Sequence, residues 1–391
     1  MPNVTVQGAH GSVSLAYDVD ANAVLAQYVA NAIATGIGNS TIIPADSAHS
    51  PVPPPLATGK IGEFVQLSTP GGVVTIPKGY NYLVDAAPSA SFIDDNTNAG
   101  QEVLVGSGNL TFDAVFGSGS VIGGSGNDNI IIGPTNANPW LIAIGNGNSV
   151  VKALGAGNDT ISTGTGYDSI QLGAGKDVVT TGGSATITAG SGSETVTAFG
   201  SDVIYGASSK LLFAAGGGAT VFGMTGSDTI TGGTGPDLFQ AGTSGGSSVI
   251  GGSGSATLLG GGSGDQLFAT GTGLQVLTAA SGNETLTGSS ASGAANQYYD
   301  NTAGATTVVA SANASSNLFG FIEGQAGGTL VETGLTAVGQ IEMHLTGYGS
   351  NDTSAISQNN AGGNLNVTLL SDGTQITFQN ITSPLTNSNF S

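Results

Sequence analysis

Short runs of alternating aliphatic and polar residues follow glycine-containing turns through the middle of the chain. The stretch GAGNDTISTGTGYDSIQLGAGKDVV, residues 155–179, shows this pattern three times. Asp159, Asp168 and Asp177 recur every nine residues, and an aliphatic residue follows each of them two positions later. Because successive side chains of a strand point to opposite faces, each unit predicts a tight turn and a short strand with its aliphatic side chain pointing inward.

The nine-residue unit recurs, with losses, from about residue 103 to about residue 290. The fullest copy is GGSGNDNII, and degenerate copies include LGAGKDVVT, GMTGSDTIT and GGTGPDLFQ. A fixed short period of this kind predicts a solenoid, in which two units on opposite sheets form one coil of about 18 residues. We expect the glycines to allow positive φ angles in the turns. The fold class predicted is therefore all-β.

Residues 1–102 have a different pattern and predict a small helix-containing region. Residues 21–35 favour a helix, with Asp20 as its N-cap and Gly36 just after its end. The apolar face predicted for this helix consists of Leu25, Tyr28, Val29, Ala32 and Ile33. The proline-rich segment 44–56 is typical of an extended linker.

Residues 291–391 contain fewer glycines and longer strand patterns, which predicts a β-rich C-terminal module. The run NLNVTLLSDGTQITFQNI favours a hairpin that turns at Ser371-Asp372-Gly373. The predicted domains are thus residues 1–102, a solenoid over residues 103–290, and this C-terminal module.

The chain of 391 residues is acidic and contains no cysteine. It has 25 acidic and 5 basic residues, a formal net charge of -20, and 67 glycines. This charge excludes nucleic acid as a partner, because phosphate binding requires clustered basic residues. No apolar run reaches the roughly 20 residues of a bilayer span, so we expect no membrane insertion. The lack of cysteine excludes disulfides and thiolate metal sites.

The repeat resembles that of the RTX family, G-G-x-G-x-D-x-aliphatic-x. The resemblance covers about half of the chain and implies a right-handed parallel β-roll that binds Ca²⁺. In that family, turn carbonyls and the aspartate of one unit coordinate the ion together with the unit two positions further on. Such oxygen-rich sites suit Ca²⁺, which takes six to eight oxygen ligands.

Carried over residue by residue, the resemblance implies one best calcium site. Asp159 and Asp177 are eighteen residues apart and fall on the same side of adjacent coils. The turn carbonyls implied for this site belong to segments that contain Gly155, Gly157, Gly173 and Gly175. Asp168 falls on the other side, where we expect Val150 and Thr186 beside it and therefore only half of a site.

The remaining aspartates match the family pattern less well. Asp228 and Asp237 are nine residues apart, which places them on opposite sides. Asp128 precedes Asp159 by 31 residues, which is out of phase with the period, and Glu194 and Glu284 replace the aspartate in their units. For Asp128, Asp228 and Asp237, a metal ligand and a turn residue that accepts backbone hydrogen bonds are both open interpretations.

The C-terminal run LLSDGTQITFQNI, residues 369–381, resembles the terminal strand pairs of proteins exported by type I secretion. That resemblance implies an uncleaved C-terminal signal. The N-terminus shows no basic region followed by an apolar region, so a cleaved signal peptide is not expected. We therefore predict an extracellular or cell-surface location reached by type I secretion without a cleaved N-terminal signal.

No catalytic motif is visible, and we expect the protein not to be an enzyme. His10, His49 and His344 are interpreted as isolated, there is no H-E-x-x-H motif, and none of the glycine- and serine-rich stretches is interpreted as a G-x-S-x-G nucleophile elbow. The carboxylate pairs Asp94/Asp95 and Glu323/Glu332 are interpreted as surface residues.

These observations favour a structural role. The hypothesis is a secreted protein that assembles head-to-tail with further copies of itself into a fibre, biofilm matrix or surface-layer lattice stabilised by Ca²⁺, because solenoid ends expose strand edges. The alternative is an adhesin or a module that binds extracellular polysaccharide without catalysis. It would stack sugars on exposed aromatic side chains, for which the choices are Trp140, Tyr298, Tyr299 and Tyr348.

Overall fold

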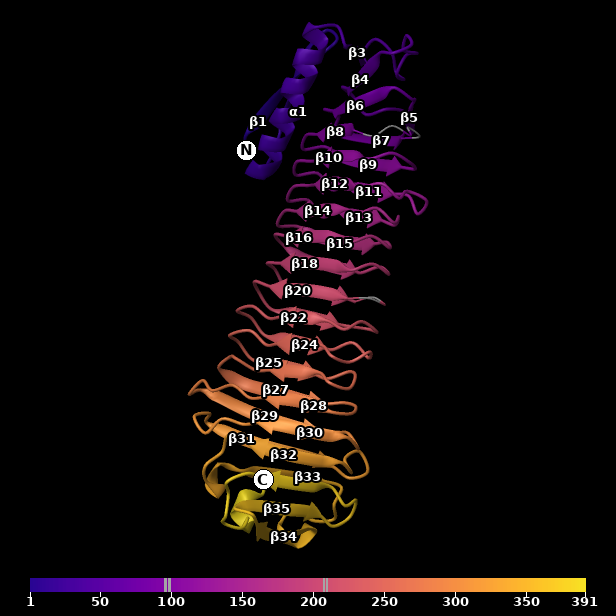
Figure 1. Cartoon of the computed structure of the whole chain (residues 1–391). Helices are drawn as coiled ribbons and strands as arrows, with labels where there is room; N and C mark the ends of the chain where they lie inside the picture. The colour runs from indigo at the N-terminus through magenta and orange to yellow at the C-terminus, as the bar shows by residue number, and fades with distance from the viewer. Residues whose placement is uncertain (95–96, 98–99, 207, 209) are drawn as a thin grey trace. The chain divides into compact units, whose positions relative to one another are not determined.

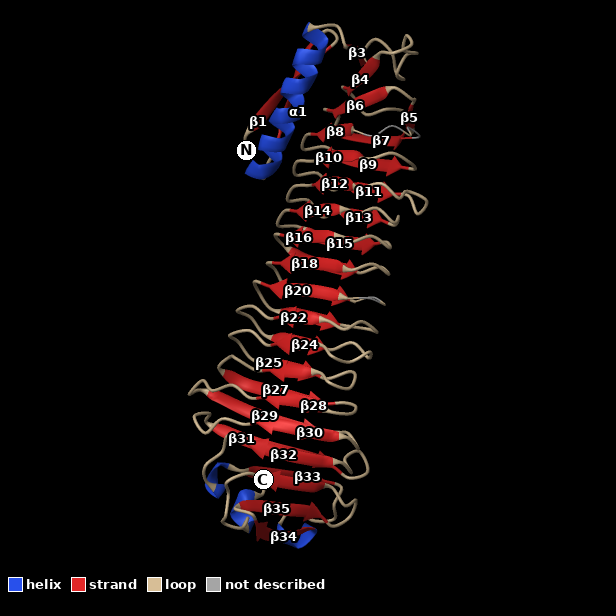
Figure 2. Ribbon diagram, viewed as in Figure 1, coloured by secondary structure: helices blue, strands red, loops and turns tan. Residues whose placement is uncertain are grey.

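The structure is a computed structural model that describes residues 1–94, 97, 100–206, 208 and 210–391. It is nearly all β, with 46% strand and 7% helix, and forms a parallel β-solenoid of about 14 turns with one N-terminal helix (Figure 2). The all-β solenoid predicted from the nine-residue pattern is confirmed. The chain divides into two compact units, Met1–Asp202 and Val203–Ser391.

In the first unit, two sheets of parallel strands alternate along the chain (Figure 1). We call them the even sheet and the odd sheet after their strand numbers. The even sheet contains β3 (Ile42–Asp46), β4 (Ile61–Gln66), β6 (Tyr80–Asp85), β8 (Gln101–Val105), β10 (Gly119–Ile122), β12 (Trp140–Ala143), β14 (Thr160–Thr163), β16 (Val178–Thr181) and β18 (Glu194–Ala198). The odd sheet contains β5 (Val74–Ile76), β7 (Ser89–Asp94), β9 (Asn109–Ala114), β11 (Asn129–Ile132), β13 (Val150–Ala153), β15 (Tyr167–Leu172) and β17 (Ser184–Thr188). Parallel pairing begins at β3, upstream of the range 103–290 predicted for the solenoid.

The second unit repeats this arrangement and follows β19 (Asp202–Tyr205), which crosses the boundary. Its even sheet contains β20 (Leu211–Ala215), β22 (Thr229–Thr231), β24 (Ser248–Ile250), β26 (Gln266–Phe268), β28 (Glu284–Thr287), β30 (Ala305–Val309) and β32 (Thr329–Thr333). Its odd sheet contains β21 (Ala219–Phe222), β23 (Asp237–Gln240), β25 (Ala256–Leu259), β27 (Gly273–Ala279), β29 (Ala294–Asp300), β31 (Ser316–Ile322) and β33 (Glu342–Thr346).

The even sheet of the second unit ends in antiparallel strands. β36 (Gln375–Phe378) pairs parallel with β32, and then β35 (Asn364–Leu369) and β34 (Ile356–Ala361) add antiparallel strands. The predicted hairpin is therefore confirmed as β35 and β36. Its turn contains Gly373 at a φ of 79°, and the Leu369 N–H donates to the Thr374 carbonyl. Three short 3-10 helices, η1 (Val338–Gln340), η2 (Thr353–Ala355) and η3 (Asn387–Asn389), lie in this region.

The core between the sheets consists of stacked aliphatic side chains. Ile161 is in register with Val179 in the even sheet, and Ile170 is in register with Ile187 in the odd sheet. All four side chains are at most 1% exposed. The inward direction predicted for the aliphatic residue of each unit is confirmed at these positions.

The positive φ angles predicted for the repeat glycines are present at Gly264 and Gly282, but the glycines of the intact repeats have a different role. Gly155, Gly157, Gly173 and Gly175 do not have positive φ angles. Instead, a Cβ added to Gly175 would overlap the carbonyl oxygen of Gly157 on the adjacent coil. Glycine is needed because successive turns stack backbone against backbone, and side chains would hold them apart.

An N-terminal hairpin and helix pack on the outer face of the first even strands (Figure 1). β1 (Asn3–Gly8) and β2 (Gly11–Ala16) form an antiparallel pair, followed by α1 (Asp20–Gly38). The predicted helix is thus present, and an antiparallel hairpin precedes it. Their buried side chains form one apolar cluster with residues of β4, β6, β8 and β10, namely Val65, Val84, Leu104 and Ile122.

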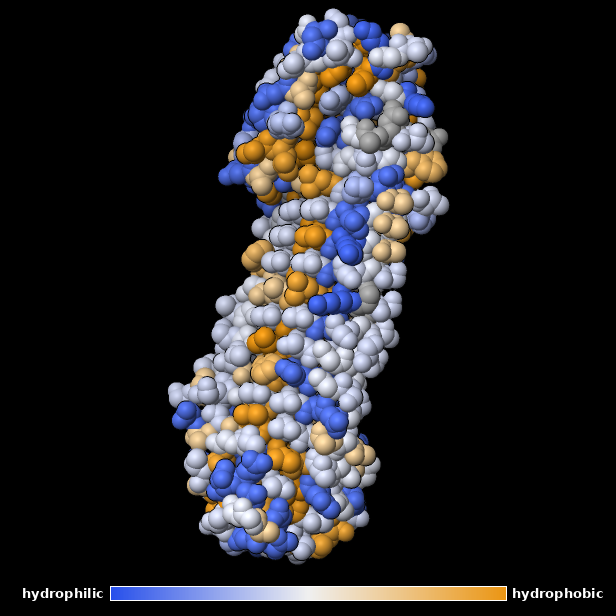
Figure 3. All heavy atoms as spheres, in the orientation of Figure 1, coloured by the Kyte–Doolittle hydropathy of each residue, from blue (hydrophilic) through white to orange (hydrophobic). Residues whose placement is uncertain are grey.

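The details of α1 differ from the prediction. The N-cap is Val19, Asp20 lies in the first turn, and Gly36 lies inside the helix against the side chain of Ile42. The buried face is narrow and made mostly of small residues, so the predicted Leu25, Tyr28 and Ala32 point outward while Val29 and Ile33 are buried. Small residues let the helix approach the sheet closely. The outward apolar side chains of α1 contribute to the hydrophobic surface at this end of the unit (Figure 3).

Candidate cation-binding sites

Three acidic residues occupy one register position on successive even strands of the first unit. The pairing of Thr160 with Val178, and of Val178 with Thr195, places Asp159, Asp177 and Glu194 on adjacent coils. The predicted pairing of Asp159 and Asp177 on one side of adjacent coils is confirmed. Glu194 follows after seventeen residues rather than eighteen, so a strict nine-residue count did not place it in this row.

The carboxylates of Asp159 and Asp177 are buried, and the hydrogen bonds in this row satisfy only some of their oxygens. The Trp140 N–H donates to Oδ1 of Asp159 at 2.7 Å, and the Asp159 N–H donates to Oδ1 of Asp177 at 2.8 Å. Both carboxylates are 1% exposed, and Oδ2 of Asp177 is buried without a hydrogen-bond partner among the described residues. Burial raises the pKa of both groups, that of Asp159 to about 6, and the charge of Asp177 adds to the rise at Asp159.

A second row lies at the start of the odd strands. It contains Asp128, Ser149, Asp168 and Ala185 in register, so neither direct register partner of Asp168 is a carboxylate. Its neighbours differ by one residue from the predicted Val150 and Thr186, because the coils here are longer or shorter than eighteen residues. Asp128 and Asp168 lie in this row two coils apart, although their spacing in the sequence is not a multiple of nine. The residues inserted after β11 lengthen the coil without moving the next strand out of register.

In the second unit, the two aspartates that match the repeat behave differently. Asp228 precedes β22 in the even sheet and Asp237 begins β23 in the odd sheet, which confirms that they lie on opposite sides. Both oxygens of Asp237 accept backbone hydrogen bonds, from Ala219 at 3.2 Å and Gly252 at 2.9 Å. This arrangement fits the turn interpretation for Asp237. Burial raises the pKa of Asp228 to about 6, against the lowering effect of backbone donors.

Two further acids continue the row of Asp228. Asp265 and Glu284 follow it in register, after Ser247. Asp265 was not predicted, because its unit lacks the spacer between the last glycine and the aspartate. Both of its oxygens accept backbone hydrogen bonds. Burial raises the pKa of Glu284 to about 7, although the Ala280 and Ser281 amides donate to it.

The carboxylate pairs interpreted as surface residues are partly buried. Asp94 is 3% exposed and Glu332 is 0% exposed, so the surface interpretation is wrong for both. Each lies at an inward or covered position of its strand. Glu323 is exposed, as predicted, and Asp95 lies outside the described residues.

The aromatic residues proposed for sugar stacking are mostly in the core. Trp140 and Tyr298 are each 1% exposed, and Tyr348 is 8% exposed. Tyr299 is half-buried and packs beside Gly320, where an added Cβ would overlap its ring. The first three side chains cannot offer a ring face to a polysaccharide in this conformation.

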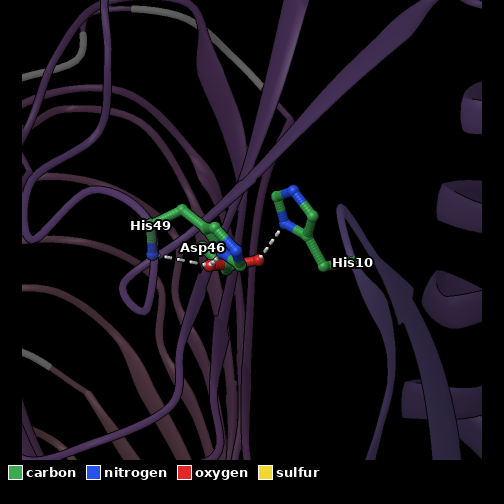
Figure 4. A group of neighbouring side chains, drawn as sticks. All are labelled: His10, Asp46 and His49. Atoms are coloured by element: carbon green, nitrogen blue, oxygen red, sulfur yellow. Dashed lines mark hydrogen bonds and ion pairs between the residues drawn. The ribbon is translucent and has the colours of Figure 1, made fainter.

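Two of the histidines interpreted as isolated lie together (Figure 4). Nδ1 of His10 and Nδ1 of His49 each lie 2.7 Å from a different oxygen of Asp46, and the two rings stack with centroids 3.6 Å apart. The Asp46 carboxylate is buried and borders a cavity of about 280 Å³. No local pattern in the sequence indicates this group, because its members come from the β1–β2 turn, the end of β3 and the turn after β3.

The histidine pair favours the ionised form of Asp46. Burial by itself would raise the pKa of Asp46, but hydrogen bonds from His49 and His10 outweigh it and lower the pKa to about 2. The carboxylate can then only accept hydrogen bonds, so both Nδ1 atoms carry the protons and donate. We interpret the group as a clasp that joins the hairpin turn to β3. In the other tautomer, with the ring proton on Nε2, the two Nδ1 atoms and the carboxylate would be three ligand atoms for a transition metal.

Asp46→Asn is expected to lower the free energy of unfolding by about 1 kcal/mol at pH 7, because it weakens two hydrogen bonds to a charged acceptor. The lowered pKa of Asp46 stabilises the fold above about pH 4, and this contribution is lost as the pH falls through 2. The difference from wild type should therefore shrink in acid, as measured by denaturant titration between pH 7 and pH 2. Asp113→Asn, at a half-buried position, is the charge-matched control; an equal loss there would contradict the clasp.

Comparison with models of known protein families gives no match, and comparison with curated proteins also gives none. The resemblance to the RTX repeat therefore depends on the repeat residues alone. Those residues fit a hard cation, because the rows combine buried carboxylate oxygens with stacked turn carbonyls. None of the helices in the described part of the chain has the length and hydropathy of a membrane span.

Proposed function

We propose that this chain is a secreted, non-catalytic structural protein whose solenoid is stabilised by Ca²⁺ and whose copies assemble into an extracellular fibre, matrix or surface layer. The observation that carries the calcium part is the buried row of Asp159, Asp177 and Glu194. An ionised carboxylate that is buried without compensation costs several kcal/mol. A cation between adjacent coils would offset that cost.

Ca²⁺ fits this row better than the other common cations. The available donors are carboxylates and turn carbonyls, which are ligands for hard cations, and the chain has no cysteine. The turns stack closely here: a Cβ added to Gly175 would meet both the carbonyl oxygen of Gly157 and Oδ1 of Asp177, and one added to Gly173 would meet the carbonyl oxygen of Gly155. The same arrangement supports weaker sites at Asp128, Asp168 and Asp228, whereas the two backbone hydrogen bonds of Asp237 favour the turn interpretation there.

Assembly is supported by the ends of the two units. Among the described pairings, β3 has a strand partner on one side only, and so does the exposed β34. Unpaired strand edges favour the addition of another chain. Pro44 opposes the addition of a chain at β3. The Ile61 N–H donates to the Thr41 carbonyl and the Ser47 N–H donates to the Val65 carbonyl, so the odd-numbered residues of β3 make the hydrogen bonds to β4. The backbone of the even-numbered Pro44 therefore faces the free edge, where proline has no N–H to donate. The edge of β34 is therefore the better contact.

The assembly is tested by sedimentation and negative-stain microscopy with and without Ca²⁺. We expect polymers that grow with protein concentration and require Ca²⁺. Ser357→Lys with Asn359→Lys places two charges on exposed positions of β34 and should reduce polymer formation at least tenfold. Ser12→Lys, which is exposed on β2, should not. A monomer in millimolar Ca²⁺ at high protein concentration would overturn the proposed assembly.

A further inference from the structure

Asp18 reaches from the link between β2 and α1 into the turns of the solenoid. Its Oδ2 accepts a hydrogen bond from the Asn146 N–H at 2.9 Å, across 128 residues of sequence. Its Oδ1 is buried and has no hydrogen-bond partner among the described residues. Asp18 does not belong to any repeat, so the nine-residue pattern gives it no role.

Asp128 lies in the turn beside Asp18 with a similar unsatisfied oxygen. Its Oδ1 accepts a hydrogen bond from the Leu110 N–H at 2.9 Å, while Oδ2 is buried without a partner among the described residues. The residue is 2% exposed. Burial raises the pKa of Asp128 to about 7, and the charge of Asp18 contributes to this rise. Two carboxylates thus repel each other, and each has one buried oxygen without a hydrogen-bond partner among the described residues.

Backbone carbonyls surround the same turn. A Cβ added to Gly124 would overlap the carbonyl oxygens of Ala16 and Gly106, and one added to Gly145 would overlap Oδ1 of Asp18 and the carbonyl oxygen of Gly124. A Cβ added to Gly123 would press on Oδ2 of Asp128. Two carboxylate oxygens and three carbonyls therefore gather around Gly123 and Gly124.

Asp85 increases the negative potential at this place. It ends β6, is 0% exposed, and its Oδ2 has no hydrogen-bond partner among the described residues. Burial, together with the nearby charge of Asp128, raises the pKa of Asp85 to about 7. Burial of three carboxylates with so few donors is costly unless a cation accompanies them.

We propose that Asp18 and Asp128, with the carbonyls of Ala16, Gly106 and Gly124, hold one Ca²⁺ that fastens the N-terminal hairpin and helix to the solenoid. The donors are all oxygens, as Ca²⁺ requires, and water supplies the remaining ligands. This proposal rests on the calcium binding of the proposed function, but it concerns a separate ion, whose ligand Asp18 lies outside the repeats. The ion here connects two parts of the fold, whereas an ion between Asp159 and Asp177 connects two coils.

The site makes docking of the N-terminal segment depend on Ca²⁺. Without the ion, Asp18 and Asp128 repel each other, and this repulsion weakens the hold of the apolar cluster, the histidine clasp and the hydrogen bonds from Asn22 and Asn146. With the ion, both carboxylates bind the same Ca²⁺, which links the N-terminal segment through Asp18 to the solenoid through Asp128. Local opening is reported by amide hydrogen exchange, so peptides from residues 1–38 should exchange more slowly in Ca²⁺.

The test compares Asp18→Asn with Asp20→Asn in the full chain. Asp20 is exposed in the first turn of α1, so its substitution removes the same charge without touching the site. We expect Ca²⁺ to slow exchange of residues 1–38 about tenfold in wild type and Asp20→Asn, and to have little effect in Asp18→Asn. Calorimetry with Ca²⁺ should show one ion fewer per chain for Asp18→Asn, and circular dichroism confirms that the variant folds.

The outcomes separate this proposal from the proposed function. If Asp18→Asn retains wild-type stoichiometry and protection, the Asp18 site is wrong while calcium binding to the repeats stands. If Asp177→Asn loses an ion but keeps the protection of residues 1–38, the two sites are independent, as proposed. If wild type binds no Ca²⁺, both proposals fail. Asp128→Asn should reproduce the effect of Asp18→Asn, and normal protection in that variant would also overturn the site.

Discussion

Calcium is expected to raise the thermal stability of the wild-type protein at pH 8, and Asp177→Asn is expected to lose a large part of that increase. At pH 8, which lies above the pKa of about 6 of Asp159, that buried carboxylate is ionised next to Asp177 on the adjacent coil. Saturation at about 100 times the dissociation constant would add about 2.7 kcal/mol for each ion bound. Differential scanning calorimetry with and without chelator measures the increase.

The same variant has a second expected property. Without Ca²⁺, Asp177→Asn should be at least as stable as wild type, because it removes a buried charge whose Oδ2 has no partner among the described residues. Asp237→Asn is the control: both oxygens of Asp237 accept backbone hydrogen bonds, so the substitution should lower stability but preserve the response to Ca²⁺. Equal calcium responses in wild type and Asp177→Asn would contradict the proposed site.

Glu63→Gln is expected to stabilise the protein increasingly as the pH rises. Glu63 lies in β4 on the same face as Val65, which packs under the N-terminal hairpin and helix. It is 0% exposed, and neither of its carboxylate oxygens has a hydrogen-bond partner among the described residues. Burial raises the pKa of Glu63 from 4.5 to about 8. Ionisation of this group therefore opposes folding.

The direction of the pH dependence follows from that shift. The folded state holds the Glu63 proton more tightly than the unfolded state does. The contribution of this proton to the free energy of unfolding is therefore fully present below about pH 4.5 and is lost as the pH rises through 8. Between pH 4 and pH 8.5, the free energy of unfolding of Glu63→Gln relative to wild type should increase by about 4 kcal/mol.

Denaturant titration across this pH range measures the difference. Glu342→Gln, at a half-buried position of β33, is the matched control, and an equal slope in that variant would contradict the role of Glu63. The amide of Gln in Glu63→Gln would also lack hydrogen-bond partners. This lowers the free energy of unfolding of the variant by the same amount at every pH, so the slope of the difference against pH is unchanged. A flat difference curve would show that Glu63 is not buried as an acid in solution.

The sequence predicted the architecture because the repeat is a local pattern. A turn, a strand and one inward aliphatic side chain recur at almost constant spacing, and each copy needs only its neighbours to bury that side chain. Ile161, Ile170 and Val179 could therefore be assigned to the core without any long-range information. The pairing of Asp159 with Asp177 followed from the same count, because both units there are intact.

The prediction failed where the spacing changes. The coil from Tyr167 to its register partner Ser184 has 17 residues, and the coil from Ala305 to Thr329 has 24. Such changes shift the register, so Glu194 and Asp265 were not placed in their rows. The expected neighbours of Asp168 were off by one residue for the same reason.

The prediction also failed where a residue's role depends on a remote partner. The role of the repeat glycines depends on the adjacent coil, which no local pattern shows. The exposed face of α1 was mispredicted because Leu25 and Tyr28 are larger than the small residues that contact the sheet. Close approach of the helix decided which face is buried, and that approach depends on the surface of β4 to β10.

What the sequence determined by itself was the repeating strand and turn, since these depend on residues close together in the chain. Apart from the pair Asp159 and Asp177, which the repeat count placed together, the tertiary structure decided which charged groups meet. It brought His10 to Asp46 across 36 residues of sequence, and Asp18 to Asp128 across 110 residues. Charges act through space rather than along the chain, so their cost, and the ion proposed to relieve it, became visible only once the coils were stacked.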